Sequence, residues 1–125
     1  MTKKLNGGSN DGQVTGELQK SNVHIIVEVV EYIPKAVVSK TILLKVTGNV
    51  TAMSFDSGEE LGEKTAPFDT YIQIIDGAAD IEIDRKVHKL ILGNGIIIPA
   101  NRSHCFYASE KFKMISTVIK SGYED

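Results

Sequence analysis

The chain has 125 residues, of which 42% are hydrophobic and 24% charged, and its formal net charge is -2 at pH 7. This length and composition are typical of one globular domain with a single core. The small net charge gives no broad basic surface, so we do not expect a nucleic-acid partner. Cys105 is the only cysteine, which excludes an internal disulfide and a cysteine-rich zinc site. The sequence contains no recognisable signal peptide or membrane span, and we expect a cytoplasmic protein without a membrane partner.

The N-terminal part differs in composition from the rest of the chain. Residues 1–21 are rich in Gly, Ser, Asn, Asp and Lys without apolar periodicity, and we expect a flexible arm. A single domain is expected over 22–125. Its first apolar segment, VHIIVEVVEYI at 23–33, is rich in β-branched residues, although its apolar spacing also fits a short helical face. We favour a strand that ends in a turn at Pro34.

After Pro34, short apolar or alternating runs are separated by turn-forming residues, which favours an antiparallel sandwich or barrel. No helix longer than a turn or two is expected. The clearest hairpin has Asp84, Arg85 and Lys86 as its connection. Some runs are apolar on both faces, so we expect a second layer or a subunit partner to cover them. The expected strands are 37–46, 50–55, 70–75, 79–83, 87–92, 95–99, 104–108 and 112–119.

Two motifs with regularly spaced glycines cover residues 58–77 and 93–108. The first contains Gly58, Lys64, Ala66, Thr70 and Gly77, and the second contains Gly93, Pro99, Asn101, His104 and Ala108. With this spacing the chain resembles the small single-domain cupins, the cupin_2-like conserved barrels, over roughly residues 37–119. The resemblance implies an all-β, RmlC-like fold, which is an antiparallel jelly-roll β-barrel.

The backbone-directing residues of these motifs have clear physical roles. Gly58, Gly77 and Gly93 are expected where the chain turns tightly between strands, at φ values that glycine adopts easily. Asn101 replaces a motif glycine and tolerates the left-handed conformation. Pro99 can end a strand because it needs no amide partner.

The metal-binding residues of the motifs are mostly replaced. In cupins, two histidines and a glutamate of the first motif and a histidine of the second bind a metal. The corresponding residues here are Lys64, Ala66, Thr70 and His104. A single imidazole does not hold a divalent metal, and a protonated lysine repels one. We therefore expect no metal and no other cofactor, with a divalent metal at His104 as the alternative.

If the cupin register holds, several side chains face the barrel interior and form a candidate ligand site. His104 is either a hydrogen-bonded structural residue or a ligand-binding or catalytic group. Lys64 either binds a carboxylate, polarises a carbonyl or forms a Schiff base, or else points outward to nearby glutamates. Cys105 alternates with His104 and is expected to face away from the site. The expected ligand-binding residues are Lys64, Thr70, His104, Phe106, Met53 and Phe55.

Three functions remain open from the sequence. The first is metal-independent binding of a small molecule, such as a carboxylate-bearing or carbohydrate-like compound. The second is an enzyme, either a metal-free isomerase or epimerase with His104 as base and Lys64 as electrostatic partner, or a metal-dependent oxygenase. The third is a non-catalytic structural barrel. In each case we expect a homodimer, because some strands are apolar on both faces.

Overall fold

The computed structural model describes residues 16–123 of the chain. In this range the longest helix is the three-residue 3₁₀ helix η1. This confirms the prediction that no helix is longer than a turn or two. None of the described residues forms a helix long and apolar enough to cross a membrane. The elements are η1 (Ile26–Glu28), β2 (Val37–Lys45), β3 (Gly48–Phe55), β4 (Glu60–Lys64), β5 (Asp69–Ile83), β6 (Lys86–Ile91), β7 (Gly95–Ile98), β8 (His104–Tyr107) and β9 (Phe112–Ile119).

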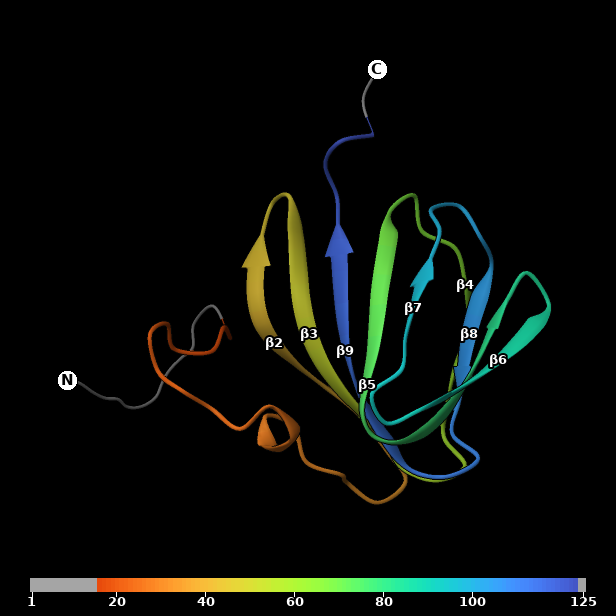
Figure 1. Cartoon of the computed structure of the whole chain (residues 1–125), viewed down its shortest axis with the longest axis horizontal. Helices are drawn as coiled ribbons and strands as arrows, with labels where there is room; N and C mark the ends of the chain where they lie inside the picture. Colours follow the sequence, from red (N-terminus) through yellow and green to blue (C-terminus); the bar gives the residue numbers. More distant parts are fainter. Residues whose placement is uncertain (1–15, 124–125) are drawn as a thin grey trace.

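The strands form one curled antiparallel sheet in the order β2-β3-β9-β5-β8-β4, and β6 and β7 also pair with β5 (Figure 1). Strand β5 contributes to two walls of this curl. Its residues 69–77 pair with β9, and its residues 78–83 pair with β6. We call β2, β3, β9, β7 and the first part of β5 the large sheet, and β4, β8, β6 and the second part of β5 the small sheet. The predicted all-β antiparallel architecture is confirmed.

The continuity of β5 corrects the expectation of two separate strands, 70–75 and 79–83. The register of β5 against β9 shifts between Ile74 and Asp76, which marks a β-bulge. Gly77 has φ +70°, and a Cβ atom on it would lie 2.1 Å from the carbonyl oxygen of Lys111. Glycine therefore does not end the strand here. It allows β5 to bend from one sheet into the other while β9 stays close.

Two other segments differ from the sequence prediction. Residues 60–64 form β4, a strand that is not among those expected from the sequence. The strand favoured for 23–33 is wrong: η1 and irregular backbone occupy this segment. The segment contributes apolar side chains instead of strand pairing, and Val30 is only 3% exposed.

The hairpin between β5 and β6 is as predicted, but its turn is shorter. Ile83 pairs directly with Lys86, so Lys86 belongs to the strand and the turn consists of two residues. Asp84 and Arg85 have φ angles of 50° and 69°. Positive φ at both central residues is the signature of a type I′ turn, which matches the twist of a hairpin.

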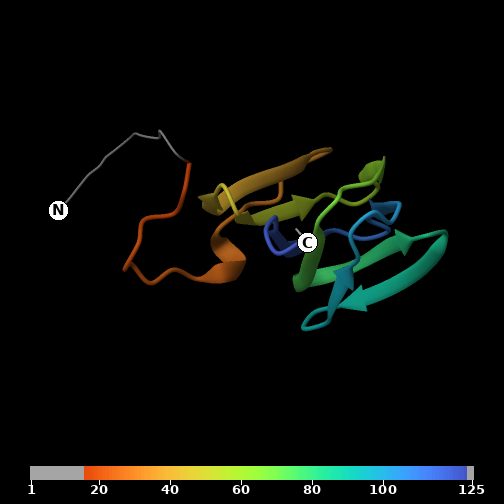
Figure 2. The same cartoon turned by 90° about the horizontal axis from the view of Figure 1, so that it is seen from above.

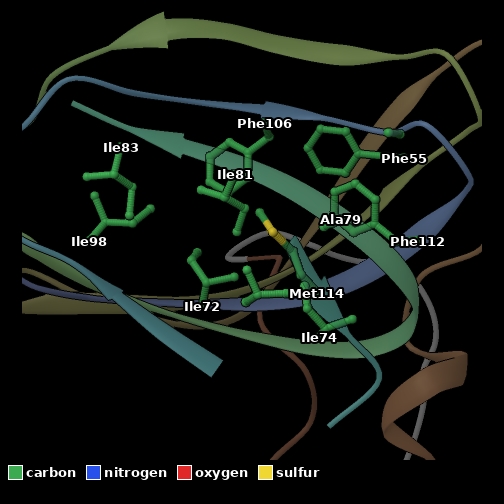
Figure 3. Close-up of a cluster of buried hydrophobic side chains, with 12 residues drawn as sticks. Phe55, Ile72, Ile74, Ala79, Ile81, Ile83, Ile98, Phe106, Phe112 and Met114 are labelled. Atoms are coloured by element: carbon green, nitrogen blue, oxygen red, sulfur yellow. The ribbon is translucent and has the colours of Figure 1, made fainter. Parts of the chain in front are cut away.

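The main core lies between the two sheets. Figure 3 shows isoleucine, phenylalanine and methionine side chains from both sheets converging on the interior. Phe55 and Phe112 stack with their ring centroids 4.5 Å apart, and both are fully buried. A second, smaller cluster of Val30, Ala52 and Ile115 lies on the outer face of the large sheet. The N-terminal segment, residues 16–36, covers this cluster and runs along one side of the curled sheet (Figure 2).

Most of the predicted N-terminal arm, residues 1–15, lies outside the described residues. The next residues contact the edge strand β2. The Leu18 amide donates to the Ile42 carbonyl at 3.2 Å, and the Glu17 carboxylate accepts a hydrogen bond from the Leu44 amide at 2.6 Å. The segment is thereby connected to the sheet edge.

The outer face of the large sheet is covered unevenly. Ile115 on β9 is 4% exposed because the N-terminal segment packs over it. Ile97 on β7 is 62% exposed, so the expected coverage of both strand faces does not occur on β7 within one chain.

Candidate functional site

A cavity of about 130 Å³ lies between the two sheets at the end where β5 begins and β9 ends. One wall comes from strands β3, β5 and β9 of the large sheet, and the other comes from strands β4 and β8 of the small sheet. Lys64 is the only exposed lining residue, so it marks the mouth, whereas buried Phe106 and Met114 lie deeper. The lining residues are Met53, Leu61, Lys64, Ala66, Thr70, His104, Phe106, Met114, Ser116 and Val118.

The loops of the two glycine motifs are joined at this end of the barrel. Asn101 adopts φ +67°, as predicted, and its amide donates to the Ala66 carbonyl at 2.7 Å. The Ala100 amide donates to the Asp69 carboxylate at 2.8 Å, which orients Asp69 toward the loop. These bonds hold the polypeptide around the mouth in a fixed arrangement.

His104 is buried at the start of β8, with 7% of its surface exposed. Its Nδ1 lies 3.1 Å from the Arg102 carbonyl oxygen. A carbonyl can only accept, so Nδ1 carries the proton and the other ring nitrogen, Nε2, has a free lone pair in the neutral imidazole. The ring meets Phe106 edge-on, with centroids 5.9 Å apart. His104 is thus oriented by backbone and packing, and its remaining nitrogen is available to a cavity ligand.

Lys64 lies directly opposite His104 in the pairing of β4 with β8. Its exposed side chain lines the cavity, and none of the ion pairs within residues 16–123 includes it. The neighbouring Glu63 carboxylate accepts a hydrogen bond from the Ser103 hydroxyl instead. Among the described residues, no carboxylate forms an ion pair with the Lys64 ammonium.

The structure brings together five of the six predicted ligand-binding residues: Met53, Lys64, Thr70, His104 and Phe106 all line the cavity. Phe55 does not line it. Although it shares a strand face with Met53, Phe55 lies further along β3 and packs against Phe112 in the core.

Five lining residues were not among the ligand-binding residues expected from the sequence: Leu61, Ala66, Met114, Ser116 and Val118. Three of them alternate along β9, so the period of two in this strand would have identified them once its inward face was known. Leu61 was missed because β4 was missed.

The donor set of the cavity does not fit a divalent metal. Its only imidazole is His104, its charged residue is a cation, and Thr70 and Ser116 offer weakly coordinating hydroxyls. Nowhere in residues 16–123 do three His, Cys, Asp or Glu side chains gather in a metal-binding arrangement.

Cys105 faces the opposite side of the small sheet, as its alternation with His104 predicts. It lines a separate hollow of about 230 Å³ together with Asp80, Glu82, Val87 and Tyr107. Partial burial, and secondarily Glu82, raise the pKa of its thiol. A raised pKa lowers the thiolate fraction at neutral pH, so Cys105 is a poor nucleophile.

Several solved structures are similar to this chain. A conserved protein of unknown function from Streptococcus pyogenes has a TM-score of 0.80 and 28% identity, over 85% of this chain and 93% of that one. A cupin superfamily protein from Desulfitobacterium hafniense has a TM-score of 0.76 and 21% identity, over 88% of this chain and all of that one (100%). A cupin 2 conserved barrel domain protein from Leptotrichia buccalis has a TM-score of 0.73 and 35% identity, over 75% of this chain and 46% of that one. No protein-family model and no curated protein matches the sequence.

Proposed function

Because this chain has the RmlC-like cupin fold, we propose that it binds a small molecule in the barrel without a metal ion. The observation that carries the proposal is the cavity at the place of the cupin motifs. Residues of both motifs line it, and Lys64 supplies a cation at a position where the family has a metal ligand. The sequence-based expectation of a cytoplasmic location stays a prediction.

The size of the cavity limits the ligand. Pockets for drug-sized ligands span about 300–1,000 Å³, whereas an apolar cavity of about 150 Å³ holds a benzene molecule. A volume of about 130 Å³ therefore suits a compound of benzene-like size rather than a nucleotide or an oligosaccharide.

The side chains that line the cavity favour a binding role over acid–base catalysis. Isomerases and epimerases of the acid–base type need a base and an acid positioned on the reacting carbon. His104 is the only imidazole in the lining, and no Asp or Glu lines the cavity among the described residues. Turnover of a substrate that depends on His104 and Lys64 would support a catalytic role instead. Failure of the binding test would support a purely structural barrel.

A thermal-shift screen against small organic acids, alcohols and sugars tests the binding role. A ligand that binds only the native state raises its stability by about 1.4 kcal/mol at ten times the Kd, which corresponds to a shift in Tm on the order of 5 °C. We expect Ser116→Leu, which fills the cavity from β9, to abolish this shift. Thr117→Leu is the matched control, because Thr117 is adjacent but does not line this cavity. If no compound shifts the Tm, or both variants respond alike, the proposal fails.

Metal independence has its own test. We expect purified protein to contain less than about 0.1 equivalent of iron, manganese, nickel or zinc, because one imidazole next to a lysine gives weak affinity. Elemental analysis after dialysis measures this content. A stoichiometric metal that is lost in the His104→Ala variant would overturn the proposal and support the oxygenase alternative.

We also propose that two copies of the chain associate through the uncovered part of the large sheet. Tyr71 and Ile97 are 45% and 62% exposed there, and Leu92, in the turn before β7, is 63% exposed. Next to them lies a hollow of about 350 Å³ whose lining residues, from Ile26 to Gly95, are all uncharged. An apolar, uncharged face matches a second copy of itself better than a charged partner, and such a symmetric contact would cover Ile97.

A further inference from the structure

The distribution of polar and apolar groups in the cavity indicates the chemical class of its ligand, and this step rests on the proposed binding function. Most of the lining is apolar: Met53, Leu61, Ala66, Phe106, Met114 and Val118. A sugar has hydroxyl groups on all sides, and burying these against apolar walls leaves them without hydrogen-bond partners, which is unfavourable. The interior therefore favours a ligand with an apolar body.

The polar groups lie on two opposite sides of this apolar interior. Lys64 and His104 belong to the small sheet, where they are paired across β4 and β8. Thr70 and Ser116 belong to the facing wall, on β5 and β9. A ligand head group at the mouth would thus find an ammonium on one side and hydroxyl donors on the other.

The charge at the mouth determines the sign of that head group. The Lys64 ammonium forms no ion pair within residues 16–123, and the lining contains no acidic side chain to compensate it. A ligand anion would supply the missing charge through a charge-assisted hydrogen bond. A ligand ammonium would instead be repelled at short range.

We propose that the cavity binds a short amphipathic monocarboxylate, with its carboxylate at Lys64 and its hydrocarbon body between Phe106, Met53 and Met114. The cavity volume of about 130 Å³ accommodates one aromatic ring or a chain of similar size. Benzoate and pentanoate are suitable probes. Their neutral counterparts, benzyl alcohol and 1-pentanol, have the same hydrocarbon body without the charge.

Titration of the full-length protein with these four compounds and with benzylamine tests the proposal. We expect benzoate to bind about tenfold more tightly than benzyl alcohol, with benzylamine weakest. The preference for the acid should decrease as salt is added, since Lys64 is exposed.

Variants of Lys64 identify the source of the preference. Lys64→Ala should lower benzoate affinity about tenfold while leaving benzyl alcohol binding unchanged. Lys64→Glu should reverse the order and favour benzylamine. Lys86→Ala is the matched control, because Lys86 is an exposed lysine on β6 that does not line the cavity. An unchanged Tm without ligand confirms that the variants are folded.

The possible outcomes separate this inference from the binding function. Tighter binding of benzoate that depends on Lys64 supports it. If benzyl alcohol, 1-pentanol or a sugar binds as tightly as benzoate, or if benzoate binding does not depend on Lys64, the carboxylate inference is overturned and the binding function stands. If none of the probes and none of the compounds in the wider screen binds, both are overturned.

Discussion

At the scale of single residues, two glycines with positive φ are required for different structural reasons. Gly77 and Gly93 both have positive φ, at 70° and 91°. Gly93 lies in open space, whereas a Cβ on Gly77 would collide with the backbone of Lys111 and Phe112. At Gly77 the requirement is therefore steric as well as conformational.

This difference predicts unequal effects of two alanine substitutions. Gly77→Ala should lower the free energy of unfolding by about 3 kcal/mol or more, because backbone atoms of β9 would have to move. Gly93→Ala should lower it by only about 1 kcal/mol, the cost of a left-handed conformation. Urea denaturation of both variants measures the difference. Equal losses would contradict the role of Gly77 in bringing β5 and β9 together.

Asp56 provides a pH-dependent contribution at one turn. Its carboxylate accepts a hydrogen bond from the Lys35 amide at 2.7 Å. This bond, followed by one from the Ser57 amide, lowers the pKa of Asp56 below its ordinary value of 3.8. Stability from a lowered pKa is present above the ordinary value and is lost as pH falls through the folded pKa.

We therefore expect Asp56→Asn to be less stable than the wild type at pH 6, and the difference to shrink as pH falls below about 4. Chemical denaturation at a series of pH values checks this trend. Glu59→Gln is the control. It removes a nearby carboxylate that does not take part in the hydrogen bonds from the Lys35 and Ser57 amides to Asp56. A constant difference between wild type and Asp56→Asn at all pH values would refute the assignment.

At the scale of elements, residues 26–33 of the N-terminal segment are attached to the large sheet by side-chain hydrogen bonds rather than by strand pairing. Tyr32 donates to the Asp76 carboxylate at 2.7 Å, and the Lys113 ammonium donates to the Val27 carbonyl at 2.6 Å. Lys113 also lies 4.8 Å from the centre of the Tyr32 ring, a cation–π distance. These contacts hold Val30 against Ala52 and Ile115 in the second apolar cluster.

Removing the Tyr32 hydroxyl should loosen this attachment. Tyr32→Phe is expected to cost about 1 kcal/mol and to increase amide hydrogen exchange in residues 26–33. Tyr107→Phe, on the small sheet, is the control because Tyr107 is 44% exposed. Equal exchange in both variants would show that apolar packing alone holds the segment.

The same bond has a pH signature at the alkaline end. Desolvation, followed by the hydrogen bond to Asp76, raises the pKa of the Tyr32 phenol above its ordinary value of 10.0. A raised pKa contributes stability that is fully present below that ordinary value and is lost as pH rises toward the folded pKa. The stability difference between wild type and Tyr32→Phe should therefore diminish above about pH 10.

Strand β5 shows why some elements were misjudged from the sequence. Asp76–Gly77 has the composition of a turn, and turn chemistry normally separates strands. Here the pairing with β9, β6 and β8 outweighs that local preference and keeps the chain extended across a bulge. The opposite occurs at 23–33, where β-branched residues find no strand partner and form no strand.

At the scale of the whole molecule, the uncovered part of the large sheet is the surface most relevant to assembly. A lysine at Ile97 would place a charge in the proposed symmetric contact, twice per dimer. We expect Ile97→Lys to shift the protein from dimer to monomer in size-exclusion chromatography with light scattering. Val87→Lys, at a residue that is 56% exposed on the small sheet, should leave the dimer intact. A wild-type monomer would refute the proposed association.

The candidate site also forms only at this scale. Lys64, Thr70 and His104 were expected to face one interior because of the motif spacing, and all three line the cavity. Phe55 could not be separated from Met53 by alternation, because both face inward on β3. Only the stacking with Phe112 places Phe55 in the core and leaves Met53 at the cavity.

Local sequence is sufficient to predict the features that depend on neighbouring residues. Positive φ at Asn101, the end of β7 before Pro99 and the hairpin at Asp84 follow from local backbone sterics. The motif spacing likewise predicted the inward face of His104. These preferences act over a few residues and need no knowledge of distant contacts.

Local sequence does not predict the continuity of β5, the existence of β4 or the depth at which each inward side chain lies. Each of these depends on contacts between residues far apart in the sequence, such as Lys64 with His104 or Gly77 with Lys111. Packing of a single buried aliphatic side chain contributes about 2–5 kcal/mol, whereas the whole scale of strand propensities spans only about 1 kcal/mol. The cavity that defines the candidate site is therefore a property of the two facing sheets and of no single motif.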